Sequence, residues 1–129
     1  MTGNNRQVIL SRMWEVEGTD QFADWYADLE EDLQIRVDAA IEWLEEKGPG
    51  LDRPFADTIK TSRHGHMKEL RPRGGNLRIL FIFDPRRTAI LLIGGDKTDR
   101  WREWYKEMIP VADRLYDDYL NELTKEELS

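Results

Sequence analysis

Two neighbouring apolar segments restrict the fold of this chain more than any other feature. Leu77–Phe83 is an almost continuous apolar and aromatic run that only Arg78 interrupts, and Thr88–Ile93 is a second such run. Between them stands Asp84-Pro85-Arg86-Arg87, a composition typical of a tight turn. Because so short a connection can join only antiparallel strands, these segments predict a β-hairpin.

A third strand precedes this hairpin. Met67–Arg71 is a short strand-like segment that ends at Pro72, and Arg73-Gly74-Gly75-Asn76 is a second turn-type connection. The chain therefore predicts a three-stranded antiparallel meander, with a further short strand near Met13–Glu17. We expect residues 49–65, which show little periodicity, to form a loop.

Helical periodicity flanks the meander on both sides. Apolar residues recur at helical spacing from Phe22 to Leu44, after an N-cap at Thr19 or Asp20, and Gly48-Pro49-Gly50 ends the pattern. The period returns at Trp101, with an interruption at Pro110 that allows a second C-terminal helix. The predicted order is β-α-α-β-β-β-α, an α+β domain in which a helical hairpin covers one face of a small antiparallel sheet and leaves the other partly open.

The 129 residues are enough for one domain. We expect this domain to span residues 12–124, with a flexible tail at 1–11 and another at 125–129. No apolar run approaches the roughly 18 residues that a membrane helix needs, and the N-terminus does not resemble a signal peptide, so we expect a cytoplasmic protein without a membrane partner. There is no cysteine, and neither histidine has a carboxylate within two residues, so we expect no metal and no cofactor.

The formal net charge of −7 conceals a basic middle segment. Residues 52–106 carry 13 of the 19 Lys and Arg residues but only 7 of the 26 Asp and Glu residues. Charge asymmetry of this kind suggests a polyanion-binding site. The alternative, that acidic helices neutralise the basic strands within the monomer, stays open.

Arg78 is the candidate site residue with the most unusual setting, because it lies within an apolar strand. Leu77 and Ile79 lie on the opposite face of that strand, whereas Leu80 shares the face of Arg78. A buried guanidinium is costly without an anionic partner. Its partner is therefore either Glu69 on the neighbouring strand or the phosphate of a ligand.

Further cations border the predicted strands at positions that a meander can bring to one end of the sheet. Such a cluster would hold a phosphodiester and stabilise negative charge that develops on it. These candidates are Lys68, Arg71, Arg73, Arg78, Lys97 and Arg100, and the cationic segment 61–66 adds Arg63 and His64.

Tyr105 lies about one helical turn past the loop that holds Lys97 and Arg100. A phenol surrounded by cations would favour its phenolate form and would serve as a general acid or base. Packing in the core together with Trp101 and Trp104 is the alternative role.

Several of these segments together resemble the phage-derived HigB branch of the RelE/ParE toxin superfamily. The resemblance covers most of residues 13–123, and the predicted order of elements is also that of the superfamily. It lies in Arg53-Pro54-Phe55, Met67–Arg71, Leu77–Phe83, Ile93–Thr98 and Trp104–Asp113.

The resemblance implies the toxin of a type II toxin–antitoxin system, an endoribonuclease that cleaves messenger RNA, commonly on the ribosome, without a metal. In that chemistry the ribose 2′-hydroxyl attacks the adjacent phosphate and the 5′-oxygen leaves. Arg78, Lys97 and Tyr105 would match the family's site positions, and Lys68 and Arg71 would match basic positions in the first meander strand. The implied partner is a cognate antitoxin of the helix-turn-helix, HigA-like kind. Two alternatives remain: a ParE-type toxin that inhibits DNA gyrase and leaves RNA intact, and a binding module without catalysis.

Overall fold

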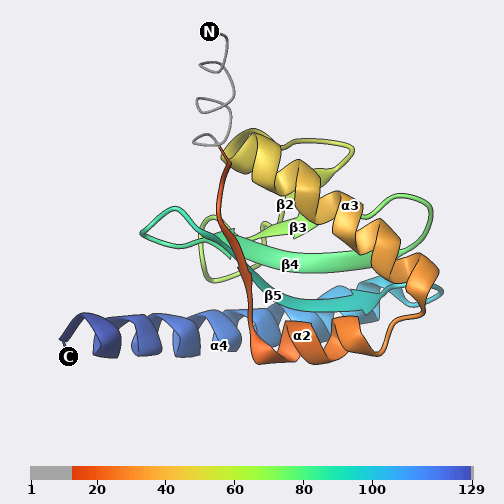
Figure 1. The fold of residues 1–129 in the computed structure, drawn as a ribbon. Helices are drawn as coiled ribbons and strands as arrows, with labels where there is room; N and C mark the ends of the chain where they lie inside the picture. The colour runs from red at the N-terminus through yellow and green to blue at the C-terminus, as the bar shows by residue number, and fades with distance from the viewer. Residues whose placement is uncertain (1–12, 129) are drawn as a thin grey trace, which may run out of the picture.

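The computed structural model describes residues 13–128, so the tail predicted at residues 1–11 lies outside the described part. The elements follow one another as a mixed α and β chain (Figure 1). They are β1 (Val16–Gly18), α2 (Asp20–Ala27), α3 (Glu31–Lys47), the 3₁₀ turn η1 (Gly48–Gly50), β2 (Ala56–Thr58), β3 (Lys68–Leu70), β4 (Leu77–Phe83), β5 (Ala89–Asp96) and α4 (Trp101–Leu128). The predicted α+β class is confirmed.

The strands form one sheet in the order β1-β5-β4-β3-β2. The antiparallel pairs β3–β4 and β4–β5 confirm the predicted meander, and β4 has the predicted bounds. Two features differ from the prediction. The segment predicted as a loop contains β2, whose three residues are too few to show an alternating pattern, and β1 pairs with β5 in parallel, so the sheet is mixed.

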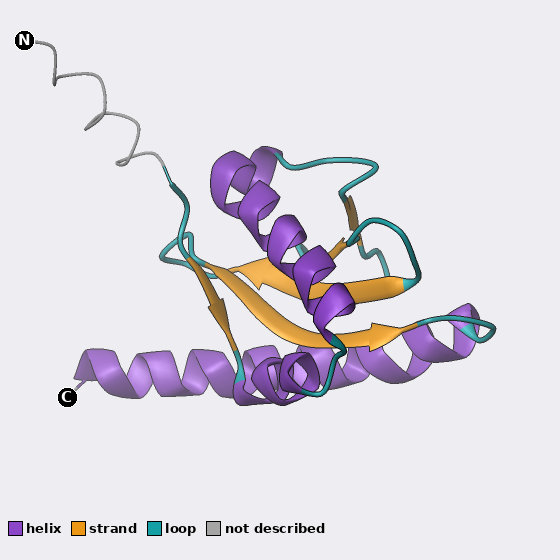
Figure 2. Ribbon diagram, turned by 45° about the vertical axis from the view of Figure 1, so that its right-hand side comes forward, coloured by secondary structure: helices purple, strands orange, loops and turns teal. Residues whose placement is uncertain are grey.

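Helices cover both faces of the sheet, so the expectation of one partly open face is wrong. Figures 1 and 2 show α3 and α4 on opposite sides of the strands. Phe22 of α2 and Leu44 of α3 belong to one core with Ile79, whereas Trp104 and Tyr116 of α4 belong to a second core on the other face. The long apolar stripe of α4 accounts for the difference, because it needs a sheet face to bury it.

The helix boundaries agree with the predicted signals except at the C-terminus. The hydroxyl oxygen of Thr19 accepts a hydrogen bond from the backbone N–H of Phe22 and caps α2, and Gly48, with φ of 56°, ends α3. Pro110 does not divide the last helix, since buried Ile109 and Ala112 beside it keep α4 on the sheet. The helix continues to Leu128, beyond the boundary expected at residue 124. None of the described helices is long and apolar enough to span a membrane.

A bulge in β5 brings the start of β4 beneath α4. Leu80 pairs with Ile93 and Phe81 with Leu91, which leaves one extra residue in β5 and places Gly95 opposite Arg78. A β-carbon on Gly95 would collide with the indole of Trp104, so the first turn of α4 lies directly against the backbone of β5. The end of β5, the start of β4 and the first turns of α4 therefore meet at one place.

Candidate functional site

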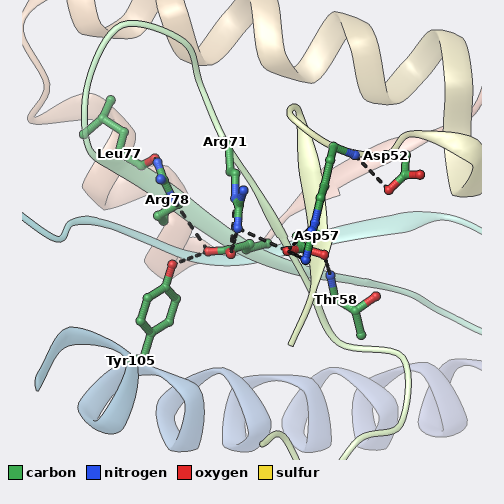
Figure 3. A network of polar contacts seen from close by, with 9 residues as sticks. Asp52, Asp57, Thr58, Arg71, Leu77, Arg78 and Tyr105 are labelled. Atoms are coloured by element: carbon green, nitrogen blue, oxygen red, sulfur yellow. Dashed lines mark hydrogen bonds and ion pairs between the residues drawn. The ribbon is translucent and has the colours of Figure 1, made fainter. Parts of the chain in front are cut away.

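Four of the predicted site residues converge where β3 and β5 end and β4 begins. Arg71 follows β3, Arg78 is the second residue of β4, Lys97 follows β5, and Tyr105 lies on the first turns of α4. Figure 3 shows Arg71, Arg78 and Tyr105 approaching one another from three different elements. The meander therefore brings together cations that are far apart in sequence, as the residue pattern predicted.

The carboxylate of Glu69 lies at the centre of this group and is almost entirely buried, at 4% exposure. The Tyr105 hydroxyl donates a hydrogen bond of 2.5 Å to its Oε1 atom, and Arg71 donates from Nη2 to its Oε2 atom at 2.9 Å. Arg78 Nε is 3.6 Å from Oε1 and forms an ion pair. The sequence pattern indicated Glu69 only as a possible partner of Arg78, whereas Glu69 contacts three of the four converging residues.

The ion pair between Arg78 and Glu69, one of the two alternatives, is therefore present. It leaves the guanidinium incompletely bonded: Nη1 donates to the carbonyl oxygen of Leu77 at 2.8 Å, but Nε has no hydrogen-bond partner. Within residues 13–128, Arg78 Nε is the one buried side-chain nitrogen or oxygen in this condition. An unpaired buried donor carries a desolvation cost, which the ion pair with Glu69 offsets only in part.

Tyr105 is a phenol here and not the phenolate expected from its cationic neighbours. Burial and the hydrogen bond to Glu69 raise the pKa of Tyr105 to about 12. The nearest charged atom is a carboxylate oxygen, which opposes loss of the phenolic proton. Tyr105 therefore holds a proton at neutral pH and can donate it.

Lys97 lies half-buried at the rim of the group. Its Nζ atom is 6.0 Å from the centre of the Tyr105 ring. Partial burial and the positive charge of Arg78 lower the pKa of Lys97. A cation held near other cations in this way is stabilised by an arriving anion.

Asp57 on β2 extends the network away from α4. Its Oδ2 atom is 3.2 Å from Arg71 Nη2 and 3.0 Å from Arg53 Nε (Figure 3). Hydrogen bonds from Arg53 and from the Thr58 backbone lower the pKa of Asp57. Arg71 is thus fixed between two carboxylates. The sequence pattern gave no sign of Asp57, because this residue lies in the strand predicted as a loop.

A pocket of about 360 Å³ opens beside this group. A second pocket of about 390 Å³ adjoins it along α4 and shares Thr61, Tyr105 and Ile109 with it. Tyr105 thus lies between two adjoining hollows. The first is lined by Thr58, Ile59, Lys60, Thr61, Glu69, Arg71, Lys97, Trp101, Tyr105 and Ile109.

Two of the predicted cations lie on the other side of the sheet. Lys68 precedes Glu69 in β3 and so points to the opposite face, where its Nζ atom contacts the carbonyl oxygen of Pro49 at 3.3 Å. Arg73 stacks over the ring of Phe55, 5.5 Å from its centre, and Phe55 packs against the core beneath α3. The predicted convergence of Lys68 and Arg73 with Tyr105 is wrong.

The remaining three candidates are paired with carboxylates of α4. Arg100 Nη2 is 2.8 Å from Glu107 Oε1, and this exposed pair points away from Glu69. Arg63 and His64 both contact Asp117, with His64 Nε2 at 2.9 Å. Since Asp117 follows Tyr105 by 12 residues, or about 18 Å along a helix, these two residues anchor a loop on α4 at some distance from Glu69.

We expect the phenol of Tyr105 to make the protein less stable as the pH rises above about 10. An unfolded tyrosine loses its proton near pH 10, whereas the pKa of folded Tyr105 is about 12, so the unfolded state is favoured between these values. Urea unfolding across this range should show a loss of up to about 2 kcal/mol, reduced by partial solvent exposure. The Tyr105→Phe variant should lose less unfolding free energy over the same pH range. An equal loss in the variant would show that Tyr105 is not the group responsible.

Residues 13–128 hold no group of three or more His, Cys, Asp or Glu side chains arranged to bind a metal ion.

Comparison with known proteins gives a consistent result. A family described as phage-derived protein Gp49-like matches residues 24–117. A protein of Mycobacterium tuberculosis named as a toxin, HigB3, is 47% identical over 100 residues, which cover 78% of this chain and 88% of the relative. A second protein of that organism, named as toxin HigB2, is 45% identical over 104 residues, and the match spans 52% of its length.

Solved structures show the same fold at low sequence identity. The archaeal RelE–RelB complex from Pyrococcus horikoshii superposes with a TM-score of 0.55 and 13% identity, over 67% of this chain and 98% of the other. The isolated RelE toxin of Escherichia coli superposes with a TM-score of 0.54 and 8% identity, over 74% of this chain and 98% of the other.

Proposed function

The chain belongs to the phage-derived Gp49-like family, and on this premise we propose that it is the toxin of a type II toxin–antitoxin system and cleaves messenger RNA. Relatives that are named toxins and the RelE-like fold support the class of protein. One observation carries the proposed activity: three cations and a protonated phenol meet beside one pocket. These residues are Arg71, Arg78, Lys97 and Tyr105.

Arg71 and Arg78 are suited to hold the scissile phosphate. Both guanidinium groups already point at one carboxylate, so a phosphate in the pocket would meet donors that are held in place. Arg78 lies behind Glu69 and adds its positive charge to this end of the pocket. Lys97, at the rim, would stabilise the additional negative charge of the five-coordinate phosphorus in the transition state.

The contact between Tyr105 and Glu69 supplies a route for the protons. Attack of the 2′-oxygen on phosphorus forms the cyclic phosphate while Glu69 accepts the 2′-hydroxyl proton. The bond to the 5′-oxygen breaks while Tyr105 donates its proton to that oxygen. Transfer of the proton from Glu69 to Tyr105, across their 2.5 Å hydrogen bond, then restores both groups. Lys68 of β3 faces the opposite side of the sheet and takes no part in this route.

The decisive experiment is cleavage of a defined RNA in the presence of EDTA. The proposed chemistry gives 2′,3′-cyclic phosphate ends, and a single 2′-deoxy substitution at the cleavage site should abolish the product. An RNA that stays intact, combined with loss of DNA supercoiling by gyrase, would support the ParE-type alternative. Intact RNA with normal gyrase activity would support the non-catalytic module.

We further propose that a cognate antitoxin binds this chain in the cytoplasm, where its messenger RNA substrate lies. Solved structures of the same fold include toxin–antitoxin complexes. A helix-turn-helix, HigA-like antitoxin and action on the ribosome follow from the family resemblance. Growth arrest on expression of this chain alone, relieved by co-expression of a neighbouring helix-turn-helix gene, would support the pairing.

A further inference from the structure

Trp101 is exposed in a way that the fold does not explain. It is the first residue of α4 and is 54% exposed, whereas Trp14, Trp25 and Trp43 are half-buried and Trp104 is buried at 3%. The contact of Trp104 with Gly95 already secures this end of the helix. An exposed indole adds little to folding, because its apolar surface remains in water.

The position of Trp101 relative to the candidate site is specific. Trp101, Tyr105 and Ile109 recur at intervals of four residues and line the same pocket as Lys97 and Arg71. The indole therefore borders the hollow in which the phosphate would lie. A flat aromatic surface next to cations is the combination with which proteins bind single-stranded nucleic acids.

We propose that Trp101 stacks on a nucleobase adjacent to the scissile phosphate and so positions the RNA strand in the pocket. The inference rests on the proposed function and names a residue of the substrate site that the charge pattern does not reveal. Stacking on an aromatic side chain tolerates every base, so Trp101 sets the position of the strand and contributes little to the choice of base. The guanidinium of Arg102, 5.2 Å from the Trp101 ring, steadies the indole.

The test is the affinity for a short RNA that carries 2′-O-methyl groups and cannot be cleaved. Trp101→Ala should weaken binding roughly tenfold, and Trp101→Phe should recover most of the loss. The matched control is Ile35→Ala, because Ile35 is equally exposed, at 60%, but lies on α3. This control should leave the affinity unchanged.

A second arm identifies the base. One abasic nucleotide is moved through the RNA, and at one position it should weaken wild-type binding about as much as Trp101→Ala does. At that position, Trp101→Ala combined with the abasic nucleotide should weaken binding no more than either change alone, because both remove the same contact. Additive losses at every position would overturn the stacking contact.

The outcomes also separate this inference from the proposed function. If the wild-type protein cleaves RNA and Trp101→Ala binds it with unchanged affinity, stacking is wrong and the proposed function stands. If in addition Trp101→Ala weakens binding of the antitoxin, Trp101 is a protein contact instead. If the wild-type protein neither binds nor cleaves RNA, both proposals fail.

Discussion

Arg78→Ala should slow RNA cleavage by about a hundredfold or more, because in the proposed reaction it removes a positive charge that stabilises the transition state. The protein should remain folded, since Arg71 and Tyr105 still bond to Glu69. Single-turnover cleavage measures the rate, and the melting temperature measured on the same preparation reports stability. Arg73→Ala is the matched control: it also removes an arginine beside the meander, but from the opposite face of the sheet, and should cleave at the wild-type rate.

The opposite pattern would assign Arg78 a structural role. In that case Arg78→Ala lowers the melting temperature strongly, while the fraction that is still folded cleaves RNA at the wild-type rate. The ion pair with Glu69 would then fully explain why an arginine lies in this apolar strand.

Tyr105→Phe should reduce the cleavage rate by a factor on the order of a hundred, because it keeps the ring and removes the hydroxyl that we propose donates a proton to the 5′-oxygen. The loss should appear in kcat with little change in KM, since the phenol acts during the reaction. Tyr119→Phe is a close control. Tyr119 also donates a hydrogen bond to a buried carboxylate, that of Asp84 at 2.6 Å, and its pKa is likewise raised to about 12 by burial and that bond.

Tyr119→Phe should therefore lose stability much as Tyr105→Phe does, yet cleave RNA normally. Cleavage at the wild-type rate by Tyr105→Phe would contradict the proton-donor role. The proton would then come from a lysine at the pocket, Lys97 or Lys60, and Tyr105 would be a core aromatic. Equal losses of activity in both variants would indicate a general effect of destabilisation.

The meander was predictable from the sequence because β4 and β5 are long, apolar and joined by short turns. The end of α3 at Gly48 was equally clear, since a glycine followed by a proline is a strong stop signal. The sequence has no comparable pattern for the three-residue strand β2 or for the parallel pairing of β1 with β5. Both depend on neighbouring strands that are distant in sequence. Continuation of α4 through Pro110 depends on tertiary packing, which outweighs the local cost of a proline.

The candidate site was predictable to the extent that it follows from strand order. Arg71, Arg78 and Lys97 meet because antiparallel neighbours share an end of the sheet. The prediction placed Lys68 on the wrong face because the local pattern is ambiguous. Lys68 and Glu69 stand between apolar Met67 and Leu70, which belong to different cores. The pattern therefore does not show which of the two charged residues faces α4. The protonation of Tyr105 could not be predicted either, since it depends on a carboxylate reaching the phenol across 36 positions of sequence.

Glu69 has a consequence for how RNA binding should respond to salt. Its carboxylate lies inside the group of cations, so Arg71 and Arg78 already have an anion that belongs to the protein itself. An incoming phosphate shares these cations with a fixed internal anion, and the net positive charge offered to the strand is smaller than the number of cations suggests. Since the salt dependence of binding reports how many backbone charges are neutralised, the affinity should fall less steeply with added salt than three free cations would require. The site thus favours selection by fit in the pocket over general attraction to any polyanion.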